Sequence, residues 1–178
     1  MTALSVNVNK IALLRNSRTN GIPSVVRAVE LAIRAGAQGI TVHPRPDERH
    51  VRPIDVDQIL GILPPHVELN IEGNQFEGRW LDIVRLARPT QATLVPDSPS
   101  QSTSDHGWDL AADARRLAPV IAELKSYGCR VALFVNHDSD AIEEARSAGA
   151  DRVQLYTEPY ANAHAGLRRS QALAPCPD

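Results

Sequence analysis

The stretch Gly39-Ile-Thr-Val-His-Pro-Arg-Pro-Asp-Glu-Arg-His50 decides the fold, because an apolar, β-branched run ends abruptly in a polar loop. The run Ile40–Val42 predicts a short buried strand, and Pro44 and Pro46 prevent its continuation as strand or helix. In parallel α/β proteins the C-terminal ends of the strands are where ligands bind. The pattern therefore predicts a strand that delivers polar side chains, beginning with His43, to a binding edge.

The loop after this strand carries three side chains that can be cationic, namely His43, Arg45 and His50. Such groups suit an anionic ligand, and we expect phosphate because guanidinium groups bind its oxygens in pairs. A solvated polar loop without a ligand would have a similar composition. A metal site at His43 and His50 is the less favoured alternative, because the neighbouring arginines repel a cation and no third ligand has suitable spacing.

The layout of this segment recurs near the end of the chain. Ala35-Gly-Ala-Gln-Gly-Ile-Thr-Val-His43 and Ala148-Gly-Ala-Asp-Arg-Val-Gln-Leu-Tyr156 each read as a helix end, a glycine, a tight turn and a buried strand. Repeated units of this kind with apolar strands imply a parallel sheet with right-handed crossovers. A (β/α) barrel and a doubly wound sheet both fit, but no Gly-x-Gly-x-x-Gly follows the first strand, which weighs against a dinucleotide-binding fold.

Hydrophobic periodicity and turn residues divide the rest of the chain into alternating strands and helices. After the first strand we expect a loop that contains Asn9, Lys10, Arg15 and Arg18. The expected strands are residues 4–8, 39–43, 67–72, 92–95, 130–135 and 152–156. The expected helices are a segment capped by Ser24 and ended by Gly36, residues 55–63, 80–87 and 110–127, and a segment capped by Ser139 that runs to 148.

Composition limits the class of protein. The 178 residues are 43% hydrophobic but only 4% aromatic, which predicts one domain with an aliphatic core. A net charge of −2 argues against nucleic-acid or anionic-membrane partners. No apolar run suggests a membrane span or a signal segment, so we expect a cytoplasmic protein. Cys129 and Cys176 have no metal-ligand spacing, and no structural disulfide is expected.

Polar side chains gather at the expected C-terminal ends of the strands. In a barrel they would surround one mouth, whereas an open sheet would spread them along an edge. Such a ring suits an acid–base site that also binds phosphate. Taken singly, Glu72 reads as a surface carboxylate and His43 as a buried, hydrogen-bonded histidine. The residues are Asn7, Asn9, Lys10, Arg15, Arg18, His43, Arg45, His50, Glu72, Asp97, Thr103, Ser104, Gln154, Tyr156, Thr157 and Glu158.

Five motifs, in order, resemble the pyridoxine 5′-phosphate synthase family over residues 4–161. The resemblance implies an α/β fold, the TIM-type (β/α)8 barrel, and a transferase of vitamin B6 biosynthesis. That family condenses 3-amino-2-oxopropyl phosphate with 1-deoxy-D-xylulose 5-phosphate to pyridoxine 5′-phosphate, phosphate and water, without cofactor or metal. The motifs are Val6-Asn-Val-Asn-Lys-Ile-Ala-Leu-Leu-Arg-Asn-Ser-Arg18, the 39–50 stretch, Leu69-Asn-Ile-Glu72, Leu94-Val-Pro96 and Gly107-Trp-Asp109.

The resemblance also implies roles for single residues. His43 and Glu72 match the family's acid–base residues. Carbonyl condensations need proton carriers of moderate pKa, and phosphate esters need fixed cations and donors, so these roles agree with the residue types. The matching substrate positions are Asn7 and Arg18 for the aminoketone phosphate, and Arg45, His50 and Thr103 for the deoxyxylulose phosphate.

Three features depart from the family pattern. Asn9-Lys10 stands where many members have Asp-His, so substrate contacts at these two positions differ. Gln154 takes the place of a carboxylate thought to stabilise the transition state, and a neutral amide cannot balance positive charge or accept a proton. A full barrel takes about 250 residues. We therefore expect a truncated member with about six of eight βα units in residues 1–162, lacking the family's strand-seven general acid, followed by an atypical, disordered tail at 163–178.

Three functions follow as alternatives. The chain is the synthase itself, or a catalytically inactive remnant that retains a phosphate-binding half-site at Arg18, Arg45 and His50, or a subunit completed by a second chain. The expected partners are phosphorylated small molecules, with no nucleic acid and no membrane. For the full-length family we expect a homo-oligomer.

Overall fold

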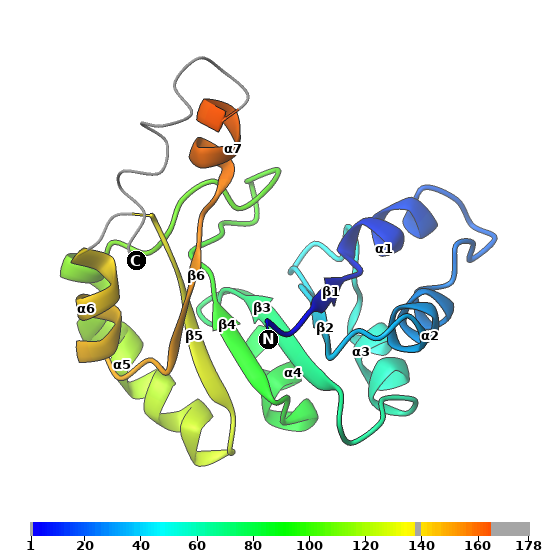
Figure 1. Cartoon of the computed structure of the whole chain (residues 1–178), viewed down its shortest axis with the longest axis horizontal. Helices are drawn as coiled ribbons and strands as arrows, with labels where there is room; N and C mark the ends of the chain where they lie inside the picture. The colour runs from blue at the N-terminus through cyan, green and yellow to red at the C-terminus, as the bar shows by residue number, and fades with distance from the viewer. Residues whose placement is uncertain (1, 138–139, 165–178) are drawn as a thin grey trace.

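Six parallel strands curve into a half-barrel in the computed structural model, which describes residues 2–137 and 140–164 (Figure 1). The order β1-β2-β3-β4-β5-β6 follows the sequence, which confirms the α/β barrel-type fold and rules out a doubly wound sheet, where the strand order reverses. Within the described residues β1 and β6 do not pair with each other. The strands are β1 (Ser5–Asn7), β2 (Gly39–Val42), β3 (Glu68–Gly73), β4 (Gln91–Leu94), β5 (Arg130–Val135) and β6 (Arg152–Leu155).

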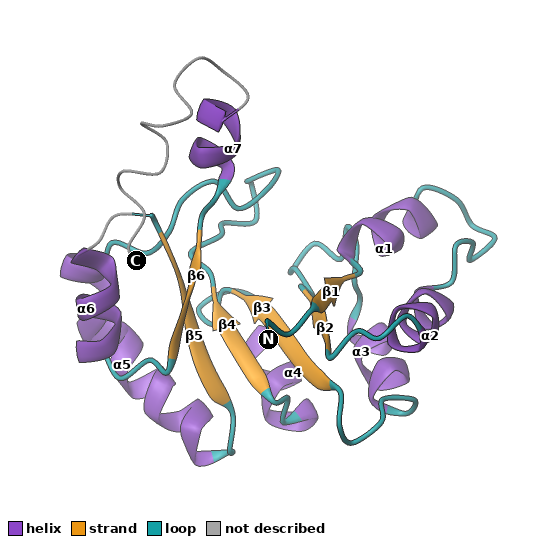
Figure 2. Cartoon of the chain, viewed as in Figure 1, coloured by secondary structure: helices purple, strands orange, loops and turns teal. Residues whose placement is uncertain are grey.

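Helices α1 to α6 lie on the outside of the curve, and α7 lies beyond the end of β6 (Figure 2). Neighbouring outer helices contact each other in sequence order, α1 with α2, α2 with α3, α3 with α4, and α5 with α6. None of the helices in residues 2–137 and 140–164 is long and apolar enough to cross a membrane. The helices are α1 (Asn9–Asn16), α2 (Val25–Arg34), α3 (Pro53–Leu60), α4 (Trp80–Ala87), α5 (Leu110–Ser126), α6 (Asp140–Ser147) and α7 (Glu158–His164).

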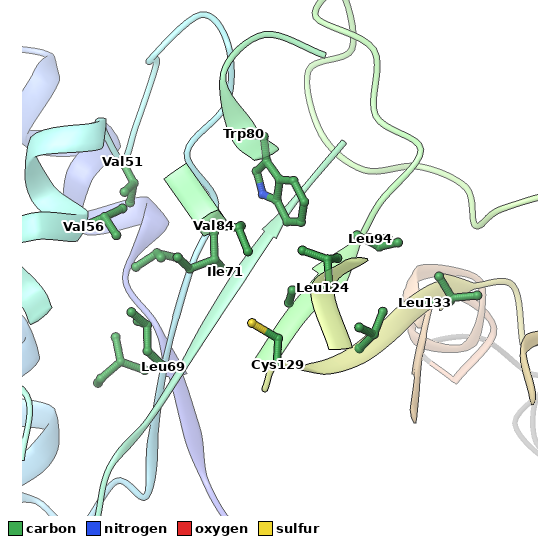
Figure 3. Packing of buried hydrophobic residues seen from close by; sticks show 14 of the residues in the cluster. Val51, Val56, Leu69, Ile71, Trp80, Val84, Leu94, Leu124, Cys129 and Leu133 are labelled. Carbon is green, nitrogen blue, oxygen red and sulfur yellow. The ribbon is translucent and has the colours of Figure 1, made fainter. Parts of the chain in front are cut away.

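Side chains alternate between two faces of the sheet, as the two-residue period of a strand requires. The convex face, which carries Val42, Ile71, Leu94 and Leu133, packs against the helices and forms the hydrophobic core (Figure 3). The concave face carries polar residues that hydrogen-bond across the strands, for example Thr93 Oγ1 to Asn70 Oδ1 at 2.8 Å. The sheet therefore has one apolar face and one polar face.

Local signals fix the ends of several elements. The Ser24 side chain accepts a hydrogen bond from the backbone N–H of Arg27 at 3.2 Å, which confirms the expected cap of α2. Helix α4 ends at Arg88 in a left-handed conformation, directly before Pro89. At the end of β3, Gly73 has a φ of +155°, and a Cβ there would lie 2.2 Å from the Trp80 ring. Only glycine lets β3 pass this close to α4.

The prediction of a loop directly after the first strand is wrong, because residues 9–16 form helix α1. Lys10, Ala12, Leu13 and Leu14 favour helix individually, although the segment lacks a strong amphipathic period. Arg18 lies in the turn that follows α1. The other expected boundaries differ from the observed ones by a few residues at most.

The third helix shows how one such shift arises. It begins at Pro53 rather than at residue 55, because the Asp55 carboxylate accepts a hydrogen bond from the Arg52 N–H at 2.8 Å and caps the helix from within its first turn. Helix α7 was not expected from the sequence, and it includes residues 163 and 164 of the expected tail. The rest of that tail, 165–178, and the expected cap Ser139 lie outside the described residues.

Candidate active site

A cavity of about 410 Å³ opens at the C-terminal ends of β1 to β3. Its walls come from β1 and α1, from the loop between β2 and α3, from the end of β3, and from the loop between β4 and α5. This edge of a barrel-type sheet is where the fold places binding residues. Nine of the polar residues expected at the strand ends line the cavity together: Asn7, Asn9, Lys10, His43, Arg45, His50, Glu72, Thr103 and Ser104.

Of the positions that were matched to the family, Gln154 and Arg18 are not part of the cavity wall. Gln154 on β6 reaches the site by a hydrogen bond from its Nε2 to Glu72 Oε1 at 3.0 Å. Arg18 is exposed beyond the end of α1 and does not line the cavity. Arg15, a further candidate from the strand ends, forms an ion pair with the buried Asp55 and donates to the carbonyl of His50, so it supports the loop from outside.

Glu72 is a buried carboxylate at the end of β3. Its Oε2 lies 3.5 Å from Asn7 Nδ2, and its Oε1 accepts from Gln154. The Trp80 indole donates to its backbone carbonyl at 2.7 Å and fixes this end of the strand. Burial raises the pKa of Glu72 to about 7, and the negative charge of Asp97 adds to the effect. Glu72 can therefore gain and lose a proton near neutral pH.

His43 follows β2 directly, one register step beyond the pair Val42–Ile71, and so lies beside Glu72 on the neighbouring strand. Burial lowers the pKa of His43 to about 3, with further lowering by His50 and Arg45. The His43 ring therefore stays neutral at pH 7, with one nitrogen as donor and the other as acceptor. Its backbone N–H donates to Asn9 Oδ1 at 2.8 Å, which ties β2 to the start of α1.

His50 closes the other end of the same loop. Its ring meets that of His43 edge to face, with 5.7 Å between centroids. Burial lowers the pKa of His50 to about 4, and the Arg45 charge contributes. The Nδ1 atom accepts from the backbone N–H of Val51 at 3.0 Å, which leaves the neutral Nε2–H as a donor. The expected cationic histidines are therefore both neutral hydrogen-bonding groups at pH 7.

Arg45 is buried and holds the loop between β4 and α5. Its Nη1 donates to Asp97 Oδ2 at 2.6 Å, and its Nη2 donates to the carbonyls of Ser98 and Gln101. A guanidinium has five N–H donors, and these three bonds leave two of them unused. Arg45 is thus a structural tie between two loops that keeps donor capacity for an anion.

Two residues in this region received no role from the family motifs. Asp97 lies three residues after the end of β4, and Glu72 is the last residue but one of β3; this position near a strand end was the available signal. Arg49 lies in the arginine-rich loop and donates to the carbonyls of Pro99, Gln101 and Ser102. The two loops are therefore joined by two arginines rather than by one.

Cations and amides complete the opposite wall. Lys10 is exposed at the cavity, and its charge contributes to the lowered pKa of His50. Within residues 2–137 and 140–164 Lys10 forms no ion pair. Asn7 Oδ1 accepts from the Asn9 N–H at 2.9 Å and fixes the first turn of α1. In the same described part, no three His, Cys, Asp or Glu residues are grouped to hold a metal ion.

Comparison with known proteins gives a consistent picture. Residues 4–177 match the family model described as "Pyridoxal phosphate biosynthesis protein PdxJ". The chain is 55% identical over 170 residues to the pyridoxine 5′-phosphate synthase of Xanthomonas campestris pv. campestris, covering 92% of this chain and 66% of that one. It is 52% identical over 180 residues to the namesake from Xanthomonas oryzae pv. oryzae, covering 97% and 71%. The namesake from Albidiferax ferrireducens is 50% identical with the same coverage. The chain thus spans about two thirds of the length of these curated relatives.

Proposed function

The chain belongs to the PdxJ family of pyridoxal phosphate biosynthesis proteins, and from that premise we propose that it catalyses ring closure in vitamin B6 synthesis. The reaction joins 3-amino-2-oxopropyl phosphate and 1-deoxy-D-xylulose 5-phosphate to give pyridoxine 5′-phosphate, phosphate and water. The observation that carries the proposal is Glu72, a buried carboxylate with a pKa of about 7 beside a neutral His43 in one cavity. Such a pair suits repeated proton transfers at carbonyl and imine carbons.

The roles follow from the surroundings of each group. Glu72 takes protons from carbon and returns them, because its pKa lies near neutral pH. His43 donates or accepts a hydrogen bond at substrate oxygens, since it stays neutral. We assign the deoxyxylulose phosphate to the wall of Arg45, His50 and Thr103, where the unused guanidinium donors and the imidazole Nε2–H meet an anion.

The other wall of the cavity supplies a further cation. Lys10 forms no ion pair in the part of the chain that the structure describes, so its ammonium group can bind a phosphate oxygen or a substrate hydroxyl. Asn7 contacts both Glu72 and the start of α1, and its amide is placed to orient the aminoketone substrate. Arg18 is assigned to the aminoketone phosphate by the family resemblance alone, since it does not line the cavity.

A second candidate function is ligand binding without turnover. The observation that favours it is Gln154, whose neutral amide faces Glu72 where the family has a carboxylate. Without that negative charge, positive charge that develops in the transition state has less compensation. On this reading Arg45, His50 and Lys10 still bind 1-deoxy-D-xylulose 5-phosphate.

Incubation of the purified chain with both substrates, followed by chromatographic detection of pyridoxine 5′-phosphate, tests the first proposal. We expect product from the wild type and a loss of at least about 100-fold in Glu72→Gln, which cannot exchange the proton. Calorimetric binding of 1-deoxy-D-xylulose 5-phosphate separates the two candidates. Binding without product, lost in Arg45→Ala but kept in Arg27→Ala on the exposed face of α2, supports the second function. A folded chain that neither binds nor turns over contradicts both.

A further inference from the structure

Asp97 lies at the meeting point of three parts of the proposed site. The carboxylate is only 5% exposed, and its Oδ2 accepts from Arg45 Nη1 at 2.6 Å and from Ser104 Oγ at 2.9 Å. The same oxygen is 3.9 Å from His43 Nε2. The Asp97 carboxylate therefore binds Arg45, binds Ser104 in the loop that carries Thr103, and lies near His43, the proposed acid–base histidine.

The contacts form a chain that begins at Asp97. Asn74 Nδ2 donates to the Asp97 carbonyl at 2.9 Å, which fixes the backbone of the aspartate against the end of β3. The carboxylate orients Arg45, and the other guanidinium nitrogen then binds the carbonyls of Ser98 and Gln101. Loss of the carboxylate would release Arg45 and the 97–104 segment together.

Charge gives Asp97 a second effect. The charged and titratable groups around it are Arg45 and His43 after β2, Glu72 at the end of β3, and Asp105 and His106 on its own loop. Burial accounts for most of the raised pKa of Glu72, and the Asp97 charge raises it further. Burial raises the pKa of Asp97 itself, and the hydrogen bond from Ser104 and the charge of Arg45 oppose this rise. The ion pair with Arg45 at 2.6 Å and the 3.9 Å distance to His43 Nε2 therefore place the Asp97 carboxylate beside groups that the proposed function uses.

We propose that Asp97 is a positioning residue for the reaction assigned above, because its carboxylate fixes Arg45 and the Thr103 loop for substrate phosphate and biases proton transfer at Glu72. This inference rests on the proposed function and assigns a role that the family motifs do not. A purely structural ion pair would resemble Arg15–Asp55, whose carboxylate is also buried and which ties α1 to α3 outside the cavity. On this proposal, substrate binding requires the Arg45–Asp97 pair and does not require the Arg15–Asp55 pair.

Asp97→Asn tests the proposal, because it keeps the shape of the side chain and removes the charge. We expect the KM for 1-deoxy-D-xylulose 5-phosphate to rise about 10-fold or more, since a charge-assisted hydrogen bond is lost. We also expect the apparent pKa that Glu72 contributes to the pH profile of kcat/KM to move to lower pH, by roughly half a unit. Asp113→Asn, which breaks an exposed pair with Arg116 on α5, is the control and should leave both quantities unchanged.

Ser104→Ala serves if Asp97→Asn does not fold, because it removes one donor to the carboxylate and leaves the charge. A roughly 3-fold rise in KM supports the proposal, and an unchanged KM overturns it. If the wild type binds substrate without turnover, the proposed catalytic function fails. A dissociation constant that is about 10-fold higher in Asp97→Asn than in the wild type then still supports the positioning role. Wild-type values of KM, binding and pH profile in a folded Asp97→Asn overturn the inference while the proposed function stands.

Discussion

The two faces of the sheet use the same strands for different purposes. On the convex face Ile71 and Leu133 are fully buried against helices, and their contribution is hydrophobic. On the concave face Thr41, Asn70 and Thr93 form a chain of side-chain hydrogen bonds that runs from β2 to β4. Neighbouring residues on a strand point to opposite faces, so side chains that stabilise the core alternate along each strand with side chains that face the candidate site.

The ionisable groups of the candidate site lie on the concave face or at the strand ends. Glu72 lies on the concave face, and His43 and Asp97 lie at the strand ends beside it. Ion pairs on the outer helices, such as Arg27 with Glu30, are exposed and contribute little. Changes on the convex side should therefore alter stability with little dependence on pH, whereas changes on the concave side should alter the response to pH.

The largest expected effect is on the convex face. Leu133→Ala removes a fully buried side chain from β5 and should lower the free energy of unfolding by about 2–5 kcal/mol. Thr93→Val on β4 keeps the volume and removes two concave hydrogen bonds, the one to Asn70 Oδ1 and the one from Gln91 Nε2, so its cost should be about 1–2 kcal/mol. Urea denaturation of both variants measures the two values. Equal losses would mean that the polar network stabilises the sheet as much as the core does.

The second prediction concerns Glu72→Gln and the pH dependence of stability. The pKa of Glu72 rises from 4.5 in the unfolded chain to about 7 in the folded one, mainly through burial. Between pH 4.5 and 7 the folded state binds more protons than the unfolded state. The contribution of Glu72 to the free energy of unfolding is therefore fully present below pH 4.5 and is lost as pH rises through 7. The loss over this pH range should be about 3 kcal/mol, and Glu72→Gln should remove this pH dependence.

His43 acts in the opposite direction and must be separated from Glu72. The pKa of His43 falls to about 3, mainly by burial, so protonation of the unfolded state lowers stability as pH falls from 6.5 to 3. Denaturation curves of wild type and Glu72→Gln between pH 5 and 8 should therefore be subtracted, which cancels the His43 contribution. A difference curve without slope would show that Glu72 titrates normally and would remove the basis for its proposed role.

Much of the fold was predictable because each βα unit carries its own signals. The β-branched run at 40–42, the Ser24 cap and the stop at Pro89 are local features, and each was confirmed. Helix α1 was missed because its hydrophobic periodicity is weak and its helical tendency comes from individual residues. Whether the sheet curves or lies open depends on how strands far apart in sequence pair, which local patterns do not encode.

The sequence predicted which residues form the candidate site better than it predicted their protonation states and contacts. Strand ends identified Glu72 and His43 as neighbours, since parallel strands end at one edge. The protonation states could not be predicted, because they depend on how deeply each group is buried. Burial keeps His43 neutral and raises the pKa of Glu72 to about 7, and no sequence pattern measures burial. The use of Arg45 as a tie to Asp97 required the folded position of the 97–104 segment.

A third, smaller effect is expected from Gln154→Glu, which restores a carboxylate opposite Glu72. The amide that now donates to Glu72 Oε1 would be replaced by a like charge, so the carboxylate pair should titrate with an upper pKa about one unit higher than that of Glu72 alone. Carbon-13 carboxyl titration by NMR measures it. Gln58→Glu on the exposed face of α3 is the control and should leave Glu72 unchanged. An unshifted Glu72 would mean that β6 does not reach the site in solution.

The smallest expected effect returns to the convex side. Ser24→Ala removes the cap of α2 and leaves the Arg27 N–H without its side-chain acceptor, at a cost of about 1 kcal/mol. The loss should be the same at pH 5 and pH 8, because the cap joins a hydroxyl to a backbone N–H and neither group titrates in this range, whereas the Glu72→Gln difference changes sharply over it. Thermal denaturation at both pH values makes the comparison. A Ser24→Ala loss that varied with pH would show that the helices and the concave site are coupled, so that the two faces of the sheet are not independent.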